Sequence, residues 1–597
     1  MSYFKLSRRS LLALAGVGLT SGCTQQSKPA VSRDERRPLS VQIKTVPADR
    51  DAAATKLARY LATQLKRVGI GATVVPMSRE ELRRSVLVDH DFDVYVYRLP
   101  LRRDPDFLRP TLHSRYAPDS GWQNPFGSND RSLDELLNRQ RTEHGTARTA
   151  TVRSIQTRLV ESQSFTPVAV PDATWASRPD RVEWPDGVPP HRAASYLAAR
   201  PADTDSSPTT EASTSETRLR MALTDARPTE NLNPLSASFR AERAMIRLVY
   251  DSLGRTRDGT IRPWMASSWT WREGDGNVLS VDLREDAEWH DGRAITASDV
   301  AFTFELLSDT SLGSLDRPVP SPRYQGRASL VDEVTARSPH ELTLEFGDVD
   351  EAVAVRALSV PILPEHVWEQ YARRTNVARL DGGDRTEALD RTNLDPVGSG
   401  PLRVTEAAPG ESLTMEPFES HFLSTGGVGE SLAEFDGGFS FDTLEFTVLP
   451  SGGAAVELLS DGTVDASANS LSPKAAAKAR EDGELAVETG EPQWCYHVGY
   501  NHRSPPFDDA GFRRAVARLV DRSSLVDDLF DGEATGIASP LETTRYAPEG
   551  DEWDDAVTEL RYLGECGTGD LDVKEAKSTF WEAGYPYSPD GELLIEK

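Results

Sequence analysis

Cysteine and lysine are both scarce in this chain of 597 residues. The three cysteines are Cys23, Cys495 and Cys566, and none belongs to a Cys-x-x-Cys pair, which argues against a cysteine-based zinc site. Cys495 and Cys566 could pair in an oxidising compartment, and the sequence leaves this open. Only ten of the 67 basic residues are Lys, so arginine supplies most of the positive charge.

The N-terminal segment lacks a hydrophobic run long enough to span a bilayer, which takes about 20 residues. Its apolar run covers only residues 11–19, and it follows the twin-arginine pair Arg8-Arg9. The run ends in Thr-Ser-Gly-Cys, which resembles a lipoprotein cleavage box. We therefore predict that residues 1–23 are a twin-arginine signal, that Cys23 carries a lipid, and that residues 24–37 are a tether from the membrane.

Acidic residues outnumber basic residues in this chain, which has a net charge of −27. Such a balance argues against nucleic acid as a partner, because phosphates need basic surfaces. The acidity is compatible with cationic ligands, but the even spread of Asp and Glu favours a solvated, halophile-like surface.

Catalytic and cofactor motifs are also missing. The sequence has no H-E-x-x-H, no G-x-S-x-G and no G-x-x-x-x-G-K motif. His497 and His502 stand beside an expected strand at a spacing too loose to indicate a metal site. We therefore expect no catalytic residues, no metal ligands and no cofactor, and a binding protein rather than an enzyme.

The most informative stretch lies at residues 263–304. Leu279, Val281 and Leu283 alternate with polar residues, which indicates a half-buried strand. A turn follows, and then Thr296 and Asp299 form a capping box that opens a helix. The lone His290 beside the turn is best interpreted as structural.

The front of the chain predicts a β-α-β-α-β block. We expect strands at about 39–45, 72–75 and 92–96. The first intervening helix carries Leu57, Leu61 and Leu65 on one face, and the second begins at the capping box of Ser78 and Glu81. Two more helices, at about 132–139 and 147–162, and a strand at 167–170 follow. Residues 201–216 are low in complexity and indicate a flexible linker.

The sequence of residues 263–304 closely resembles the corresponding sequence in the peptide/nickel class of extracellular solute-binding proteins of ABC transporters. Further similarities follow in the family's order. They are LNP at 232–234, YDSL at 250–253, ILPEHVW at 362–368, PVGSGPL at 396–402, YNHRSPPFDD at 500–509, DRSSLV at 521–526 and EAGYP at 582–586. The resemblance implies an α/β fold: a two-lobed, type II periplasmic-binding-protein-like fold with an extra subdomain and crossover strands between the lobes.

One block is out of the family's order. Residues 38–170 resemble the C-terminal part of family members, although here they come first. We therefore expect a circular permutation, with residues 38–170 and 497–597 building lobe 2. Residues 171–200 would return to lobe 1, which would comprise residues 217–496 and hold a subdomain at about 254–390. The alternative is a fusion of a truncated binding protein with an unrelated α/β domain.

The resemblance also implies function and partners. A monomer, lipid-anchored on the extracellular face of the cell membrane, would capture a peptide or another small solute and deliver it to an ABC permease and its ATPase. The sequence leaves open a sensor that reports to a signalling receptor, and an oligosaccharide-binding member of the same family.

The ligand would lie in a cleft between the lobes, contacted by loops that match the family's ligand-binding loops. The expected contacts are Tyr97, Arg98, Leu101, Arg102, Asp104, Trp122, Ala226, Arg227, Thr229, Glu230, Asn231, Trp494 and Tyr496. In peptide-binding relatives, an Asp stands four places before the Pro of the Asp-Pro step and holds the peptide amino group. Leu101 occupies that position here, so Asp104 is the alternative carboxylate.

Overall fold

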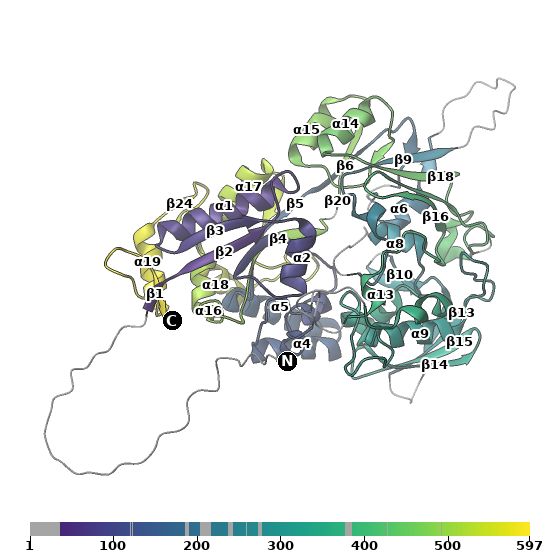
Figure 1. Cartoon of the computed structure of the whole chain (residues 1–597), viewed down its shortest axis with the longest axis horizontal. Helices are drawn as coiled ribbons and strands as arrows, with labels where there is room; N and C mark the ends of the chain where they lie inside the picture. Colours follow the sequence, from purple (N-terminus) through teal and green to yellow (C-terminus); the bar gives the residue numbers. More distant parts are fainter. Residues whose placement is uncertain are drawn as a thin grey trace, which may run out of the picture.

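The computed structural model shows two lobes, each built around its own β-sheet (Figure 1). It describes residues 36–596 apart from 120, 122, 186–189, 191, 203–216, 237–242, 258, 273–276, 376–384, 427 and 491. Cys23 and Trp122 therefore lie outside the described residues. Among those described, no helix is both long and apolar enough to cross a membrane.

The sheet of lobe 2 joins strands from both ends of the chain. In order across the sheet they are β22 (Ala534–Gly536), β5 (Phe165–Pro171), β21 (Trp494–Tyr500), β4 (Val94–Pro100), β2 (Ser40–Thr45) and β3 (Gly71–Pro76). β2 runs parallel to β3 and β4, whereas β21 is antiparallel to both β4 and β5. β21 therefore inserts between two strands of the front block.

Helices cover the lobe 2 sheet, and those of the front block lie where the sequence predicts them. They are α1 (Ala52–Arg67), α2 (Arg79–Leu87), α4 (Arg131–Thr142), α5 (Gly145–Ser162), α16 (Ala510–Ala517), α17 (Arg522–Phe530), α18 (Asp551–Glu559) and α19 (Val573–Glu582). α1 begins at Asp51, whose carboxylate accepts from the Ala54 N–H, and it buries Leu57, Leu61 and Leu65. α2 begins with the predicted capping box of Ser78 and Glu81.

The two ends of the described chain meet in lobe 2 (Figure 1). β1 (Arg36–Pro38) pairs antiparallel with β25 (Leu594–Glu596). A Cβ on Gly69, whose φ is +84°, would lie 2.1 Å from the carbonyl oxygen of Gly591, so this close approach requires glycine. Leu39 and Ile595 belong to one hydrophobic core. Residues 38–170 thus share both sheet and core with the end of the chain.

Lobe 1 is built on a seven-stranded sheet. Its strands, in order, are β16 (Leu402–Ala408), β17 (Ser412–Pro417), β18 (Thr443–Val448), β9 (Arg218–Leu223), β19 (Ala466–Ser467), β6 (Ala173–Ser177) and β20 (Ala486–Gly490). Its helices include α6 (Ala193–Ala198), α7 (Arg227–Glu230), α8 (Arg243–Val249), α14 (Gly452–Ser460) and α15 (Pro473–Glu481). β6 belongs to the segment expected to return to this lobe.

A smaller four-stranded sheet extends lobe 1. Its strands are β12 (Ala266–Trp271), β13 (Val278–Leu283), β15 (Glu341–Phe346) and β14 (Val331–Ser338), and its helices and turns include α9 (Ala297–Ser308), α10 (Gln325–Ala328), α11 (Glu351–Ala354), η3 (Val355–Ser359), α12 (Glu365–Trp368) and α13 (Glu387–Asp390). Leu279, Val281 and Leu283 are buried as their alternation predicts. The Thr296 N–H donates to the Asp299 carboxylate (2.9 Å) at the start of α9.

His290 connects this sheet's turn to the PVGSGPL segment. Its Nε2 lies 2.9 Å from the Gly400 carbonyl oxygen, and its backbone N–H donates to the Gly398 carbonyl oxygen (2.8 Å). Burial lowers the pKa of His290. These contacts give His290 the structural role that the sequence suggested.

Two short extended connections join the lobes. β5 in lobe 2 leads to β6 in lobe 1, and β20 in lobe 1 leads to β21 in lobe 2. Because β21 begins at Trp494, lobe 2 resumes there rather than at the expected residue 497. Paired extended connections are the usual hinge between two lobes that close on a ligand.

Candidate functional site

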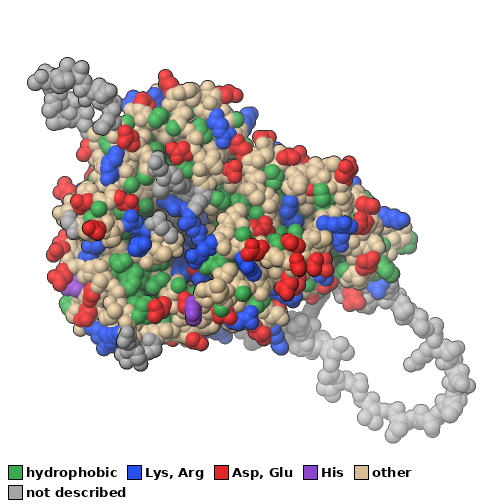
Figure 2. All heavy atoms as spheres, turned by 180° about the vertical axis from the view of Figure 1, so that it is seen from behind, with side chains coloured by type: hydrophobic (Ala, Val, Ile, Leu, Met, Phe, Trp, Pro, Cys, Tyr) green, Lys and Arg blue, Asp and Glu red, His purple; other side chains and the backbone are tan. Residues whose placement is uncertain are grey.

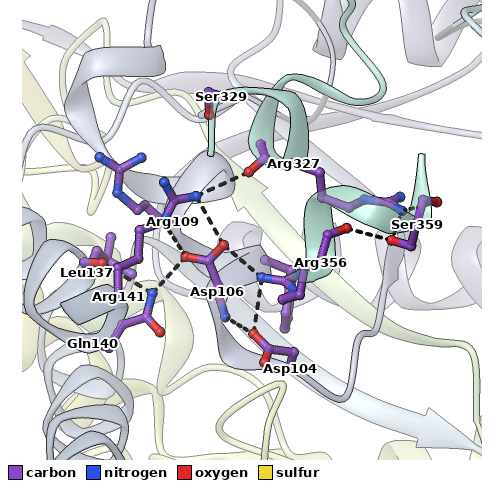
Figure 3. Close-up of polar contacts among 12 residues, drawn as sticks. Asp104, Asp106, Arg109, Leu137, Gln140, Arg141, Arg327, Ser329, Arg356 and Ser359 are labelled. Atoms are coloured by element: carbon purple, nitrogen blue, oxygen red, sulfur yellow. Dashed lines mark hydrogen bonds and ion pairs between the residues drawn. The ribbon is translucent and has the colours of Figure 1, made fainter. Parts of the chain in front are cut away.

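The lobes meet at the loop that follows β4. This loop contains η1 (Pro105–Phe107) and α3 (Leu108–Leu112) and packs against α10 and η3 of lobe 1. At its centre is Asp106, which is 1% exposed (Figure 3). A buried carboxylate needs positive partners, because burial without them carries a large desolvation penalty.

Asp106 has partners in both lobes. Arg141 of α4 donates to it from Nε (2.6 Å) and Nη2 (3.0 Å), and Arg356 of η3 donates from Nη1 (2.7 Å). Burial by itself raises the pKa of Asp106, but these guanidinium groups outweigh burial and hold the pKa below its usual range. The Arg356 contact is an almost buried ion pair between the lobes.

Asp104 belongs to the same network. Its carboxylate lies 3.1 Å from Arg148 of α5 and 3.1 Å from Arg356, and it accepts the Asp106 N–H (2.9 Å). Figure 3 shows Arg356 between the two carboxylates. Asp104, the alternative carboxylate for a ligand ammonium, is therefore already held by two arginines.

A second interlobe ion pair joins α2 to the segment after β9. Arg79 Nη1 lies 3.0 Å from Asp225 Oδ2, and both side chains are largely buried. Arg227 also donates to Asp225 from Nε (2.7 Å). Burial raises the pKa of Asp225, but Arg227 and Arg79 together shift it well below the usual range.

Arg83 is half-buried near charged groups of both lobes. This residue of α2 lies close enough to Tyr97 of lobe 2 and to Arg227 of lobe 1 for both to affect its charge. Burial, with Arg227 and Arg79 as like charges, lowers the pKa of Arg83 to about 9, although Tyr97 and Asp225 oppose the shift.

Three of the predicted residues form a separate cluster inside lobe 2. Arg98 donates to Asp51 (2.6 Å), and its guanidinium lies 4.6 Å from the ring centroid of Trp494. The Tyr496 hydroxyl also donates to Asp51 (2.9 Å). These side chains secure the start of α1 to β4 and β21, and the indole N–H of Trp494 is buried without a described partner.

The contacts of the remaining predicted residues are mainly with backbone atoms. Leu101 N–H donates to the Gln493 carbonyl oxygen (2.8 Å), its side chain packs on the lobe 2 core, and the neighbouring Arg102 is half-buried. Thr229 Oγ1 donates to the Ala226 carbonyl oxygen (2.7 Å).

The end of α7 completes this set. Asn231 is buried, and its side-chain oxygen accepts the Asn233 N–H (2.7 Å). Glu230, the last residue of α7, is half-buried. The buried amide of Asn231 therefore serves local structure, and Glu230 is the one carboxylate among the predicted residues of this loop.

Sequence reasoning missed the residues that join the lobes, namely Asp106, Arg356, Arg79 and Asp225. Asp106 stands in the Asp-Pro-Asp loop, so its loop was recognised although its role was not. Arg356 lies 250 residues further along the chain, so no spacing rule connects it to Asp106. An arginine inside a largely apolar segment, as in residues 352–360, is the signal that could have found it.

Surface hollows are found elsewhere on lobe 2. One of about 420 Å³ is lined by Arg59, Lys66 and Thr73 among others, on the outer side of α1 and β3. Another of about 450 Å³ is lined by polar residues that include Lys44, Asp91 and Asn501. Neither is lined by the residues that join the lobes.

Two α/β lobes with two extended connections and polar contacts between them define the class of hinged, two-lobed binding proteins. The family described as bacterial extracellular solute-binding proteins, family 5 Middle, matches residues 260–597. The chain belongs to this family, which confirms the resemblance inferred from the 263–304 stretch and the expectation of a binding protein rather than an enzyme.

Known relatives are similar over part of their length. The oligopeptide-binding protein AppA of Bacillus subtilis (strain 168) is 24% identical over 309 residues, which are 50% of this chain and 50% of AppA. Heme-binding protein A of Haemophilus influenzae is 23% identical over 367 residues, 58% of each chain. The chain thus spans about half the length of the curated relatives it matches.

Solved structures show the same partial likeness. AppA of Bacillus subtilis in complex with a nonapeptide matches with a TM-score of 0.45 at 19% identity, covering 64% of this chain and 67% of AppA. NikZ of Campylobacter jejuni in complex with Ni(L-His) matches with a TM-score of 0.44 at 19% identity, covering 64% of this chain and 65% of NikZ.

Proposed function

We propose that this protein captures a small, peptide-like solute between its lobes and delivers it to an ABC importer. The observation that carries the proposal is the charged contact of Arg356 in lobe 1 with Asp104 and Asp106 in lobe 2. Such a contact holds the lobes together without a continuous apolar interface, so the lobes can separate at moderate cost. Membership of the extracellular solute-binding family supports the same function.

The mechanism follows from the hinge. A solute that contacts both lobes binds the closed form more tightly than the open form, and it shifts the equilibrium by that difference in affinity. The loop after β4 and the segment after β9 are the two surfaces that a solute would bridge. Each already contacts the other lobe, the loop through Asp106 and Arg356 and the segment through Asp225 and Arg79. The closed protein would then dock on the permease.

Peptide-like ligands are supported by what the relatives are named to bind. The AppA relative is described as an oligopeptide-binding protein, and another relative as a probable di/tripeptide-binding protein of Pseudomonas aeruginosa. The residues proposed to contact the solute are those of the two loops, with Arg102 and Glu230 as half-buried charged side chains, whereas Tyr97 belongs to the buried core of lobe 2.

A ligand screen tests this function. The chain is heated with peptide pools, oligosaccharides or metal chelates in high salt, and unfolding is followed by dye fluorescence. A ligand present at 100 times its Kd should stabilise the fold by about 2.7 kcal/mol. A reproducible rise in melting temperature with peptides supports the proposal, whereas no response in any of the three classes contradicts it.

Export and anchoring form a second part of the proposal. We propose that the twin-arginine segment exports the chain and that Cys23 carries the lipid that holds it at the outer face of the membrane. The family is extracellular, and a lipid on Cys23 would place the binding lobes beside the permease. Residues 1–35 lie outside the described part of the structure, so the support comes from their sequence alone.

Circular permutation is the third part. The sheet shared by β2, β4, β5, β21 and β22 and the pairing of β1 with β25 are what a permuted chain requires. A fusion of an unrelated domain would instead bring its own sheet and core. The shared core of residues 39–170 and 495–595 supports the permuted origin.

A further inference from the structure

The outer flank of helix α1 is basic, although the chain as a whole is acidic. Its 16 residues include Lys56, Arg59, Lys66 and Arg67 and no Asp or Glu, whereas the chain has 94 acidic and 67 basic residues. On the face in Figure 2, Asp and Glu side chains are spread over both lobes. The acidic surface that is typical of this chain is therefore interrupted at α1.

The helix dipole accounts for only part of this charge. It stabilises cations near the C-terminal end of a helix and anions near the N-terminal end. Lys66 and Arg67 lie in the last turn of α1, but Lys56 and Arg59 lie in its N-terminal half. The exposed residues recur at spacings of three or four and so form one basic stripe, which consists of Lys56, Arg59, Thr63 and Lys66.

A surface hollow of about 420 Å³ lies between this stripe and strand β3. The side chains of Arg59 and Lys66 make no hydrogen bond or ion pair with any residue of the described chain. The hollow has no acidic residue in its lining, which consists of Arg59, Ala62, Thr63 and Lys66 of α1 and Ala72, Thr73 and Val74 of β3. Two cations at this hollow therefore keep their hydrogen-bond donors for another molecule.

Strand β3 is the outermost strand of the lobe 2 sheet and pairs with β2 on one side only. The N–H groups of Gly71 and Met77 both donate to carbonyl oxygens at or next to the ends of β2 (2.9 Å each). Because backbone groups point to alternate sides along a strand, the N–H and C=O groups of Ala72 and Val74 face away from β2. These two residues line the hollow, which thus presents unpaired backbone donors and acceptors.

The other outer strands of the two large sheets are protected in ways that β3 is not. Strand edges are commonly blunted by charged side chains or by short length. β16 carries Arg403 and Glu406, β20 carries Glu488, and β22 is three residues long. β3 has six residues, none of them charged, and its proline is the last residue, Pro76. An edge of this kind can accept a further strand.

We propose that β3 and the basic stripe of α1 form a docking groove for an extended, acidic segment of a partner protein. The segment adds to β3 as a further strand, with main-chain hydrogen bonds to Ala72 and Val74. Its Asp or Glu side chains pair with Arg59 and Lys66. The groove lies on the outer side of lobe 2, so this interaction is separate from solute capture between the lobes.

Charge complementarity selects the acidic partner. A second copy of the chain that paired its own β3 with this one would bring two basic stripes together, and like charges across an interface are unfavourable. A basic strand would meet the same repulsion from Arg59 and Lys66. An acidic strand instead gains the backbone ladder and the ion pairs at once.

Fluorescence anisotropy of labelled octapeptides with the full chain tests the groove. The first probe is Glu-Thr-Val-Glu-Thr-Val-Glu-Thr, the second has Lys in place of each Glu, and the third has Pro in place of each Val. We expect the first to bind at least about tenfold more tightly than the others, because only it offers both the charge and an uninterrupted strand. No binding of the first probe, or equal binding of the first and either of the others, overturns the proposal.

The variant Val74→Pro locates the binding, since a peptide could also enter between the lobes. Proline removes an N–H that faces away from β2, so the sheet should still form and the melting temperature should change little. Binding of the acidic probe should fall by at least about tenfold, because the added strand loses a main-chain donor and meets the proline ring. Val74→Thr keeps the N–H and should bind as the unaltered chain does. Unchanged binding by Val74→Pro would place the peptide elsewhere and overturn the groove.

A reversal of charge tests the basic stripe. The double variant Arg59→Glu, Lys66→Glu should weaken binding of the acidic probe by about tenfold and make the lysine probe the tighter ligand, because the sign of the groove is reversed. Lys474→Glu with Lys478→Glu on α15 of lobe 1 makes the same change in net charge and should alter neither affinity. A groove variant that still prefers the acidic probe overturns the role of the stripe.

Discussion

Arg356 of lobe 1 places its guanidinium 2.7 Å from Asp106 and 3.1 Å from Asp104 of lobe 2, and Asp106 is almost fully buried. Asp106 keeps a second, bidentate partner, Arg141, within its own lobe. Removing Arg356 therefore removes one ion pair between the lobes without leaving a buried carboxylate unpaired, which makes this contact testable on its own.

The variant Arg356→Gln should open the ligand-free protein. The carboxylates retain Arg141 and Arg148, so the free energy of unfolding should fall by only about 1–2 kcal/mol. Small-angle X-ray scattering should show a larger radius of gyration than that of the unaltered chain. An unchanged scattering profile would show that other contacts hold the lobes together.

The variant Asp106→Asn removes the carboxylate of the same ion pair and should cost more stability than Arg356→Gln. It leaves the buried Arg141 without its carboxylate and Arg356 with Asp104 alone. Breaking a buried pair in this way costs about 3–5 kcal/mol. Chemical denaturation measures the loss. The surface pair Arg373–Glu387 serves as control: Arg373→Gln should change stability by less than about 1 kcal/mol, because that arginine is 67% exposed.

His497 should make the protein sensitive to acid. Its Nε2 lies 2.7 Å from the Tyr95 hydroxyl, and its ring packs edge-on against Phe126 and Phe165. Burial lowers the pKa of His497 to about 3. Between this value and an unfolded pKa of about 6.5, only the unfolded chain binds the proton, so stability falls as pH falls, by about 3 kcal/mol from pH 6.5 to 4.

Denaturation of His497→Gln at pH 7, 5.5 and 4 tests this origin of acid sensitivity. The variant should be less stable at pH 7 but should lose less stability on acidification. His144→Gln, at a side chain that is 88% exposed, should follow the unaltered chain at every pH. Identical pH dependence of His497→Gln and the unaltered chain would remove His497 from the explanation.

The two described cysteines should differ in reactivity. Both are free: Cys495 is buried in the lobe 2 core and Cys566 is exposed. Burial raises the pKa of the Cys495 thiol to about 12, which suppresses the reactive thiolate. Maleimide should label Cys566 in the native chain and Cys495 only after unfolding, as peptide mass spectrometry can show. A disulfide between them, or native labelling of Cys495, would contradict the structure.

The permutation can be reversed. Arg36 pairs directly with Glu596, so a two-residue turn can join these ends, while new ends are opened within the 203–216 linker. The rearranged chain should fold with a stability within about 2 kcal/mol of the original, because no sheet hydrogen bond is lost. Thermal unfolding measures this. New ends between Tyr97 and Arg98, inside β4, are the control and should prevent folding.

Lipid attachment predicts a change in location. Cys23→Ser should release the protein from the membrane fraction into the medium, because a thioether-linked lipid cannot form on serine. Fractionation and immunoblotting of expressing cells measure the release, with Cys566→Ser as a cysteine control that should stay bound. Membrane association unchanged in Cys23→Ser would rule out that anchor.

Local patterns were enough to predict many elements of this fold. The alternation of Leu279, Val281 and Leu283 predicted β13, and the Ser78–Glu81 capping box predicted the start of α2. Strands and helices of this kind depend on interactions between residues within a few positions of one another. Such short-range patterns can be recognised in the sequence itself. The order of the family's motifs, also linear, led to the family and to the expectation of permutation.

Tertiary structure alone decided which charges meet. Asp106 and Arg356 are 250 positions apart, and Arg79 and Asp225 are 146 apart, so no spacing rule connects them. It also placed Arg98, Trp494 and Tyr496 around Asp51, although sequence had assigned them to the ligand. The sequence by itself determined many of the elements and the family. The pairing of buried charges depended on how both lobes pack, because a buried ion is tolerated only where the whole surrounding fold brings a partner to it.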